Sequence, residues 1–94
     1  MALSRTVVAG MENTITVYGA DWCSDCRRSK KLLDEMGVDY EYVDLIADPT
    51  AADRAQAISG HTTIPVIAFS DGTHFVEPSD EDLRDKVEAL AGRL

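Results

Sequence analysis

Long hydrophobic runs are absent from this sequence of 94 residues. No apolar stretch approaches the roughly 20 residues that a membrane-spanning helix requires. The N-terminal region has Arg5 as its only positive charge and no continuous apolar segment, so we do not expect a signal peptide. These absences predict a cytoplasmic protein, and the length allows one domain with a modest core.

Positive charge is also scarce. Nine lysines and arginines stand against seventeen acidic residues, which gives a formal net charge of −8. This excess argues against nucleic acid or an anionic membrane as a partner. Four of the basic residues are clustered, at Arg27, Arg28, Lys30 and Lys31. We interpret most of this cluster as a solvated helix face, although Arg27 is well placed to stabilise a thiolate four residues before it.

Cysteine is limited to two residues, both in the segment Trp22-Cys23-Ser24-Asp25-Cys26. The segment follows an alternating, strand-like run at 14–18 and leads into a helical pattern at 27–37. If Cys23 lies at the first turn of that helix, the free backbone N–H groups there favour its thiolate. Cys26 then lies one turn away, close enough to close a disulfide. The pattern predicts a redox pair in which Cys23 is the nucleophile and Cys26 the resolving cysteine.

Two other uses of the cysteines remain open at this point. A structural zinc ion needs four ligands, and the remaining nitrogen candidates, His61 and His74, lack the spacing of a ligand pair. We therefore predict no metal site. A static disulfide would close a very short loop and add little stability. The position of the pair between a strand and a helix favours redox chemistry over both.

The rest of the chain alternates between strand-like and helical patterns. Expected strands lie at 39–45, 65–69 and 73–76, and expected helices open at 48–50 and at Ser79. Asp71-Gly72 predicts a hairpin between the last two strands. Apolar residues at helical spacing give the last helix a core-facing stripe; they are Leu83, Val87, Leu90 and Leu94.

The predicted order is βαβαββα. This order is typical of an α/β fold with a four-stranded mixed sheet flanked by three helices. We assign residues 14–94 to this domain and interpret residues 1–13 as an N-terminal extension.

From residue 14 onward the sequence resembles the glutaredoxin branch of the thioredoxin-like fold. The resemblance is carried by three motifs, namely the segment from Trp22 to Cys26, Thr63-Ile64-Pro65 and the Asp71-Gly72 turn. Within that branch the chain is similar to the mycoredoxins. The shared segments are Val43-Asp44-Leu45, Thr63-Ile64-Pro65-Val66 and Phe69-Ser70-Asp71-Gly72-Thr73 leading to Pro78-Ser79.

This resemblance implies a monomeric thiol-disulfide oxidoreductase without a tightly bound cofactor. It implies that Pro65 has a cis peptide bond beside the cysteines, and that the backbone of Ile64 pairs with an incoming thiol. The implied substrate-binding residues are Trp22, Arg27, Thr63, Ile64, Pro65, Ser79 and Asp80. The implied partners are mixed-disulfide or disulfide proteins and a low-molecular-weight thiol or a reductase as electron donor.

Departures from the glutaredoxin pattern bear on the donor. Ser24-Asp25 stands where glutaredoxins usually have Pro-Tyr and mycoredoxins Gly-Tyr. The lysine before the nucleophile is missing, and the Gly-Gly pair that helps to hold glutathione is replaced by residues 76–79. Acidic residues flank the site and are expected to repel the carboxylates of glutathione; they are Asp21, Asp25, Glu77 and Asp80. We therefore expect mycothiol to be the preferred co-substrate.

Two alternative functions are compatible with the same resemblance. One is a hydrogen donor fed by thioredoxin reductase, as for ribonucleotide reductase. The other is a binding module in which two copies bridge a [2Fe–2S] cluster, because Ser24 after the first cysteine is compatible with such a site.

Overall fold

The computed structural model describes residues 14–91. The predicted N-terminal extension (residues 1–13) and the end of the chain (92–94, with Leu94 of the apolar stripe) lie outside the described residues. Seven elements follow one another: β1 (Ile15–Gly19), α2 (Ser24–Glu35), β2 (Glu41–Asp44), α3 (Ala51–Ser59), β3 (Val66–Phe69), β4 (His74–Val76) and α4 (Asp80–Ala91). This is the predicted βαβαββα order.

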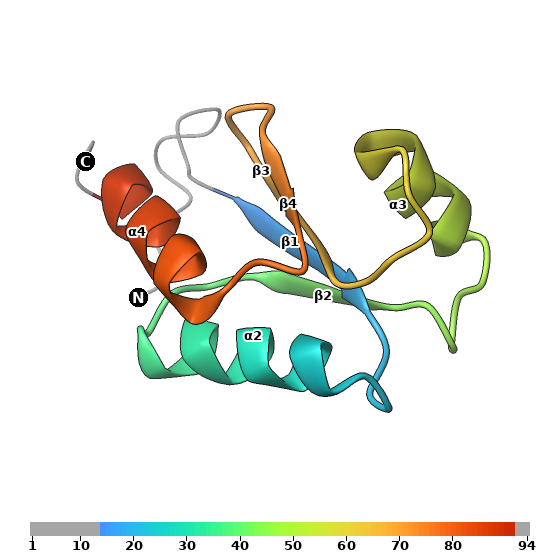
Figure 1. Ribbon diagram of the computed structural model, residues 1–94, viewed down its shortest axis with the longest axis horizontal. Coiled ribbons are helices and arrows are strands. Elements are labelled where there is room, and N and C mark those ends of the chain that lie inside the picture. The colour runs from blue at the N-terminus through green and yellow to red at the C-terminus, as the bar shows by residue number, and fades with distance from the viewer. Residues whose placement is uncertain (1–13, 92–94) are drawn as a thin grey trace, which may run out of the picture.

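The strands form one mixed sheet in the order β2-β1-β3-β4 (Figure 1). β1 and β2 are parallel, with Val17 opposite Tyr42, and α2 connects them. β3 runs antiparallel to β1, with Val17 opposite Ile67, and β4 runs antiparallel to β3. The central position of β1 matters for function, because its C-terminal end leads directly into the segment with the two cysteines.

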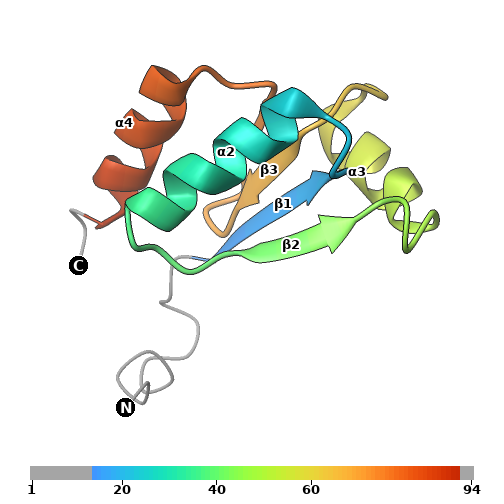
Figure 2. The same cartoon turned by 90° about the horizontal axis from the view of Figure 1, so that it is seen from below.

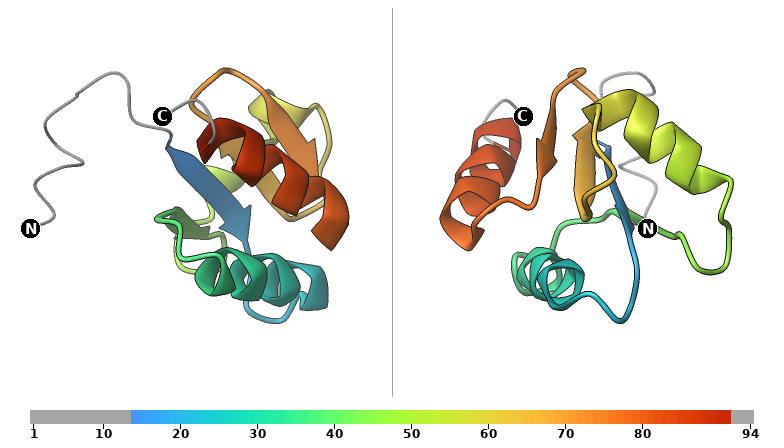
Figure 3. Two further views of the ribbon diagram at one scale, coloured as in Figure 1. Left: turned by 90° about the vertical axis from the view of Figure 1, so that its left-hand side faces the viewer. Right: turned by 45° about the vertical axis from the view of Figure 1, so that its right-hand side comes forward.

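The helices cover both faces of the sheet. α2 and α4 lie on one face and α3 lies on the other, as the right-hand view of Figure 3 shows. Figure 2 shows α2 and α4 from the side on which they cover the strands. The main core lies between the sheet and the helices α2 and α4. It consists of Ile15, Val17, Leu32, Leu33, Ile67, Phe69, Leu83, Val87 and Leu90. The predicted stripe of α4 is thus confirmed at its three described positions. None of the helices within residues 14–91 is long and apolar enough to cross a membrane.

The first helix begins earlier than its apolar periodicity indicates. The sequence pattern places its start near Arg27, whereas α2 begins at Ser24, directly after Cys23. Ser24 and Asp25 are polar and add nothing to an apolar stripe, so the periodicity cannot reveal the first turn. Cys23 is therefore the N-cap residue of α2, and Cys26 lies in its first turn.

An ion pair fastens the β3–β4 turn to α4. Lys86 Nζ donates a hydrogen bond of 2.7 Å to Asp71 Oδ2 and lies 5.2 Å from the centre of the Phe69 ring. The backbone N–H and the hydroxyl of Thr73 donate to the other oxygen of Asp71. The hydrogen bond from Lys86, followed by those from Thr73, lowers the pKa of the Asp71 carboxyl. Asp71 is therefore best stabilised as a carboxylate in the folded protein.

We expect Asp71→Asn to lower the melting temperature at neutral pH by a few degrees. Because the folded-state pKa of Asp71 is lowered, its contribution is complete above the ordinary aspartate value of about 3.9 and is lost as the pH falls towards the folded-state value. The difference in melting temperature should therefore shrink in thermal scans taken below about pH 4. Glu88→Gln, on the exposed surface of α4, is the matched control. A difference that stays constant down to acidic pH would contradict this assignment.

Candidate active site

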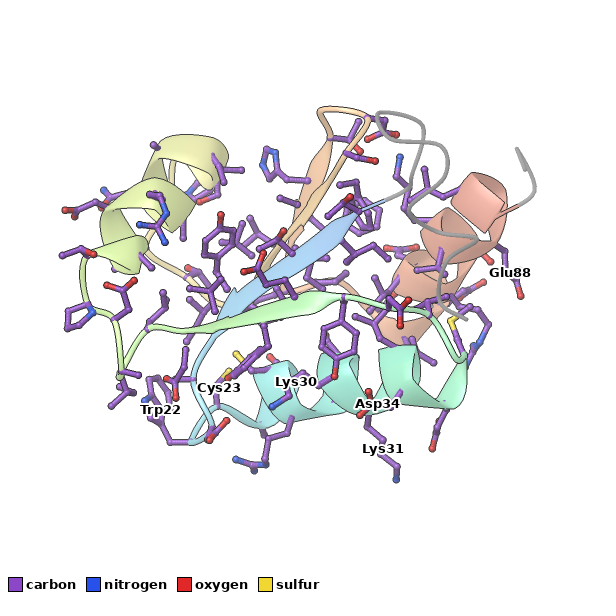
Figure 4. All side chains as sticks on the ribbon, turned by 180° about the vertical axis from the view of Figure 1, so that it is seen from behind. Trp22, Cys23, Lys30, Lys31, Asp34 and Glu88 are labelled. Carbon is purple, nitrogen blue, oxygen red and sulfur yellow. The ribbon has the colours of Figure 1, made fainter. Side chains whose placement is uncertain are left out.

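Cys23 occupies the position before the first turn of α2. Its backbone is extended (φ −86°, ψ 118°), and its Sγ accepts a hydrogen bond of 3.3 Å from the N–H of Cys26. The N–H of Cys23 in turn donates to the carbonyl of Ala20 at 3.1 Å, which closes the turn after β1. Figure 4 shows Trp22 and Cys23 side by side at this end of the helix. Cys23 is partly exposed, and its sulfur thus lies at the positive end of the helix dipole, as predicted.

Cys26 has the opposite environment. It is completely buried, and the two cysteines are not bonded to each other in this structure. Burial, with the hydrogen bond to Cys23 as the next cause, raises the pKa of the Cys26 thiol to about 12. Cys26 therefore stays protonated near neutral pH, whereas Cys23 is the accessible sulfur. The structure thus places the two cysteines in unequal environments.

The loop before β3 approaches Cys23 from the other side. The peptide bond between Ile64 and Pro65 is cis, as the resemblance implied, and Pro65 is buried. The thiol of Cys23 lies 4.0 Å from the carbonyl oxygen of Ile64. Thr63 is exposed beside them. A ligand bonded to Cys23 would therefore meet the backbone of this loop. The side chain of Pro65 lies beneath it and is fully buried.

A shallow hollow continues from this loop towards α3. It is lined by Leu45, Ala52, Ala55, Gln56 and residues 61–64.

Trp22, which directly precedes Cys23 in the chain, has 69% of its surface exposed and is free to contact a substrate. Among residues 14–91, no group of three or more histidine, cysteine, aspartate or glutamate side chains could hold a metal ion.

The segment after β4 is the third part of the site, beside the start of α2 and the loop before β3. Glu77 has a positive φ of 50° and its N–H donates to the carbonyl of Pro65 at 3.0 Å. Ser79 caps α4, since its Oγ accepts from the N–H of Asp82 at 3.1 Å. Asp80 forms an ion pair with Arg28, 2.5 Å from Nη1 to Oδ1. The side chains of Ser79 and Asp80, both predicted to bind substrate, therefore already have partners within the protein.

Arg27 and Arg28 make different contacts. Arg27 Nη1 donates to the carbonyl of Asp21 at 2.6 Å, which stabilises the turn before Cys23. Arg28, rather than Arg27, is the partner of the aspartate between the cysteines: its Nη2 lies 3.3 Å from Oδ1 of Asp25. The sequence singled out Arg27 and left Arg28 within the solvated cluster.

Asp21 is also paired. Its Oδ1 accepts a hydrogen bond of 3.2 Å from the Tyr42 hydroxyl and lies 3.7 Å from Lys30 Nζ, which itself stacks 3.8 Å above the Tyr42 ring. Burial, and then the charge of Asp21, raise the pKa of Tyr42, so its hydroxyl remains a donor. Three of the four acidic residues expected to repel glutathione thus have cationic partners, namely Asp21, Asp25 and Asp80. Their repulsion is weaker than the sequence indicates.

Gly19 is a site residue that sequence reasoning missed. It is the last residue of β1, and a Cβ placed on it would lie 2.7 Å from Sγ and 3.1 Å from Cβ of Cys26. The same Cβ would lie 3.5 Å from the Tyr42 ring. A glycine at the end of a strand is a sign of close approach by another group. Here Gly19 leaves the space in which Cys26 is buried.

Comparison with known proteins agrees with this geometry. The glutaredoxin family profile matches residues 15–75, more than half of the chain. Mycoredoxin 1 of Corynebacterium glutamicum is 35% identical over 80 residues, which are 84% of this chain and 99% of that protein. A putative glutaredoxin of Mycobacterium tuberculosis is 30% identical over 79 residues, 83% of this chain and 94% of its own length.

Solved structures show the same fold. The crystal structure of a glutaredoxin from Archaeoglobus fulgidus superimposes with a TM-score of 0.70 at 25% identity, over 76% of this chain and 82% of that one. The NrdH-redoxin of Escherichia coli has a TM-score of 0.67 at 24% identity, over 77% and 92% of the two chains. Together with the accessible Cys23 and the buried Cys26, these similarities show that the chain belongs to the glutaredoxin family of thiol-disulfide oxidoreductases with a thioredoxin-like fold.

Proposed function

We propose that the protein reduces mixed disulfides and protein disulfides through Cys23, with Cys26 as the resolving cysteine. The observation that carries this proposal is the contrast between the two sulfurs. Cys23 is accessible and accepts a backbone N–H, whereas Cys26 is buried with its pKa raised to about 12. Only Cys23 is suited to attack an external disulfide, and only Cys26 is shielded from external thiols.

The proposed reaction is a series of thiol–disulfide exchanges, in each of which one disulfide bond breaks as another forms. The Cys23 thiolate attacks the low-molecular-weight half of a mixed disulfide, and the protein substrate leaves as a thiolate that takes up a proton. Cys23 is then joined to the small thiol. Either a second small thiol attacks that bond, or Cys26 loses its proton and attacks Cys23, which releases the small thiol and leaves the Cys23–Cys26 disulfide. An external thiol or reductase supplies the two electrons that restore the dithiol.

Three segments would bind the substrate around Cys23. We assign the exposed ring of Trp22 to one side, Thr63 with the backbone of Ile64 to the other, and Pro65 to the buried floor. At the start of α4, the side chains of Ser79 and Asp80 are already engaged. The N–H of Asp82 donates to Ser79, so a small thiol would meet the backbone N–H groups at the very start of α4, which lack partners within a helix. Arg27 would contribute by holding the turn before Cys23.

We further propose that mycothiol is the preferred small thiol. Support comes from the similarity to a protein named mycoredoxin over 84% of the chain, and from residues 76–79 in the place of a Gly-Gly pair. Side chains at Glu77 and Pro78 occupy space that two glycines would leave open, and Pro78 has no backbone N–H to donate to a ligand. In this proposal the protein is a cytoplasmic monomer without a tightly bound cofactor.

The donor is tested by coupled assays with one shared mixed-disulfide substrate. Consumption of NADPH is measured with mycothiol and its reductase, with glutathione and glutathione reductase, and with thioredoxin reductase alone. We expect the fastest turnover in the mycothiol system. Equal or faster turnover with glutathione would refute the preference. Efficient turnover with thioredoxin reductase alone would identify a hydrogen donor of the ribonucleotide-reductase type instead.

A further inference from the structure

Arg28 connects three segments of the active site. Its Nη2 lies 3.3 Å from Oδ1 of Asp25, between the cysteines, and donates a hydrogen bond of 3.2 Å to the carbonyl of Pro78. Its Nη1 lies 2.5 Å from Oδ1 of Asp80, at the start of α4. The planar guanidinium can serve these three acceptors at once, which a lysine ammonium on its flexible stem does less well.

The contact with Asp25 has an electrostatic consequence. A carboxylate two residues after Cys23 disfavours a negative charge on that sulfur. Arg28 places a positive charge against this carboxylate, and the hydrogen bond that Arg28 donates to Asp80, ahead of the one that it donates to Asp25, raises the pKa of Arg28. The side chains of Arg28 and Asp25 are 37% and 42% exposed, so solvent weakens their attraction without removing it.

The contacts with Pro78 and Asp80 have a geometric consequence. The segment from Glu77 to Asp80 is held at its first residue, where the N–H of Glu77 donates to the carbonyl of Pro65. Arg28 holds the other end. The wall beside Cys23 is therefore fastened on one side to the cis-proline loop and on the other to the helix of the two cysteines.

We infer that Arg28 is a positioning residue for the Cys23 thiolate: it neutralises Asp25 and fixes the wall formed by residues 77–80. The inference rests on the proposed role of Cys23 as nucleophile. Other charged or titratable residues lie in the segments around Cys23 and are the same in all the variants compared; they are Asp21, Arg27, His61, Glu77 and Asp80. Cys26, whose N–H bonds to the Cys23 sulfur, is serine in all of these variants. A charge on Asp25 is tolerated in this chain because Arg28 accompanies it.

The test measures how the alkylation rate of Cys23 by iodoacetamide depends on pH. A Cys26→Ser background leaves one reactive thiol. We expect Arg28→Met to move the midpoint of this profile upward by about half a unit to one unit, a three- to tenfold loss of thiolate below the midpoint. With Asp25→Asn present, the same Arg28→Met change should move the midpoint by at most about a third as much.

Lys31→Met is the matched control, because it removes a positive charge from the same helix. Figure 4 shows Lys31 pointing away from the sheet, and the residue is exposed. Its midpoint shift should be clearly smaller than that of Arg28→Met. If Arg28→Met shifts the midpoint equally with and without the Asp25→Asn change, or does not shift it at all, the inference is overturned.

A conservative variant keeps the test decisive if Arg28→Met does not fold. Arg28→Lys retains the positive charge but loses the planar, two-pronged guanidinium group. It should therefore shift the midpoint of the alkylation profile upward by less than Arg28→Met does, and the Asp25→Asn change should again abolish this shift. Alkylation needs no electron donor. The titration can therefore fail or succeed independently of whether mycothiol, glutathione or a reductase supports turnover.

Discussion

Cys23→Ser is expected to reduce turnover of a small mixed disulfide to the uncatalysed rate, whereas Cys26→Ser should keep it within about tenfold of wild type. The difference follows from the environments of the two sulfurs. Cys23 is the accessible sulfur at the start of α2, and serine at this position cannot form a disulfide. Cys26 is buried and protonated, and a second molecule of small thiol can replace it in the resolving step.

The same pair of variants separates the two classes of substrate. A protein disulfide needs both cysteines, so Cys26→Ser should lose that activity while it retains reduction of the mixed disulfide. Mass spectrometry of Cys26→Ser after exposure to an oxidised small thiol should show one molecule of that thiol attached to Cys23. Equal loss of mixed-disulfide reduction in the two variants, or attachment at Cys26 in a Cys23→Ser protein, would reverse the assignment.

Gly19→Ala is expected to lower the free energy of unfolding by about 1–3 kcal/mol, as overpacking of a buried site usually does. The added Cβ would lie 2.7 Å from Sγ of Cys26, too close for two unbonded atoms. Neither partner can move easily, because β1 is paired on both sides and Cys26 is in the first turn of α2. We expect the clash to displace Cys26 and to slow formation of the Cys23–Cys26 disulfide.

Denaturant unfolding and the rate of intramolecular disulfide formation measure these two effects. Cys26→Ala removes the nearest atom of the clash, so Gly19→Ala should cost less in that background. Thr16→Ala, at a half-buried position of the same strand, is the control for a general loss of strand stability. If Gly19→Ala costs the same with and without the Cys26 sulfur, the close approach is not what requires glycine.

Local patterns in the sequence were sufficient to predict the fold and the position of the two cysteines at the start of a helix. Alternation in the strands, the Asp71-Gly72 turn, the Ser79 cap and the stripe of Leu83, Val87 and Leu90 each depend on residues a few positions apart. The spacing of Cys23 and Cys26 after a strand is likewise a feature of residues that lie only a few positions apart. Such features are predictable because the backbone itself places residues at these short separations in contact.

The electrostatic environment of the site was decided by the tertiary structure. From the sequence alone, Asp25 stands unopposed near Cys23 and Arg28 is one of several surface cations. Arg28 meets Asp80, 52 residues away, only because α4 returns to pack beside α2. Asp21 meets Tyr42 because β2 lies alongside β1, and Gly19 matters because Cys26 turns back against it. Charges and volumes act over a few ångströms of space, and only the folded chain determines which distant residues come within that range.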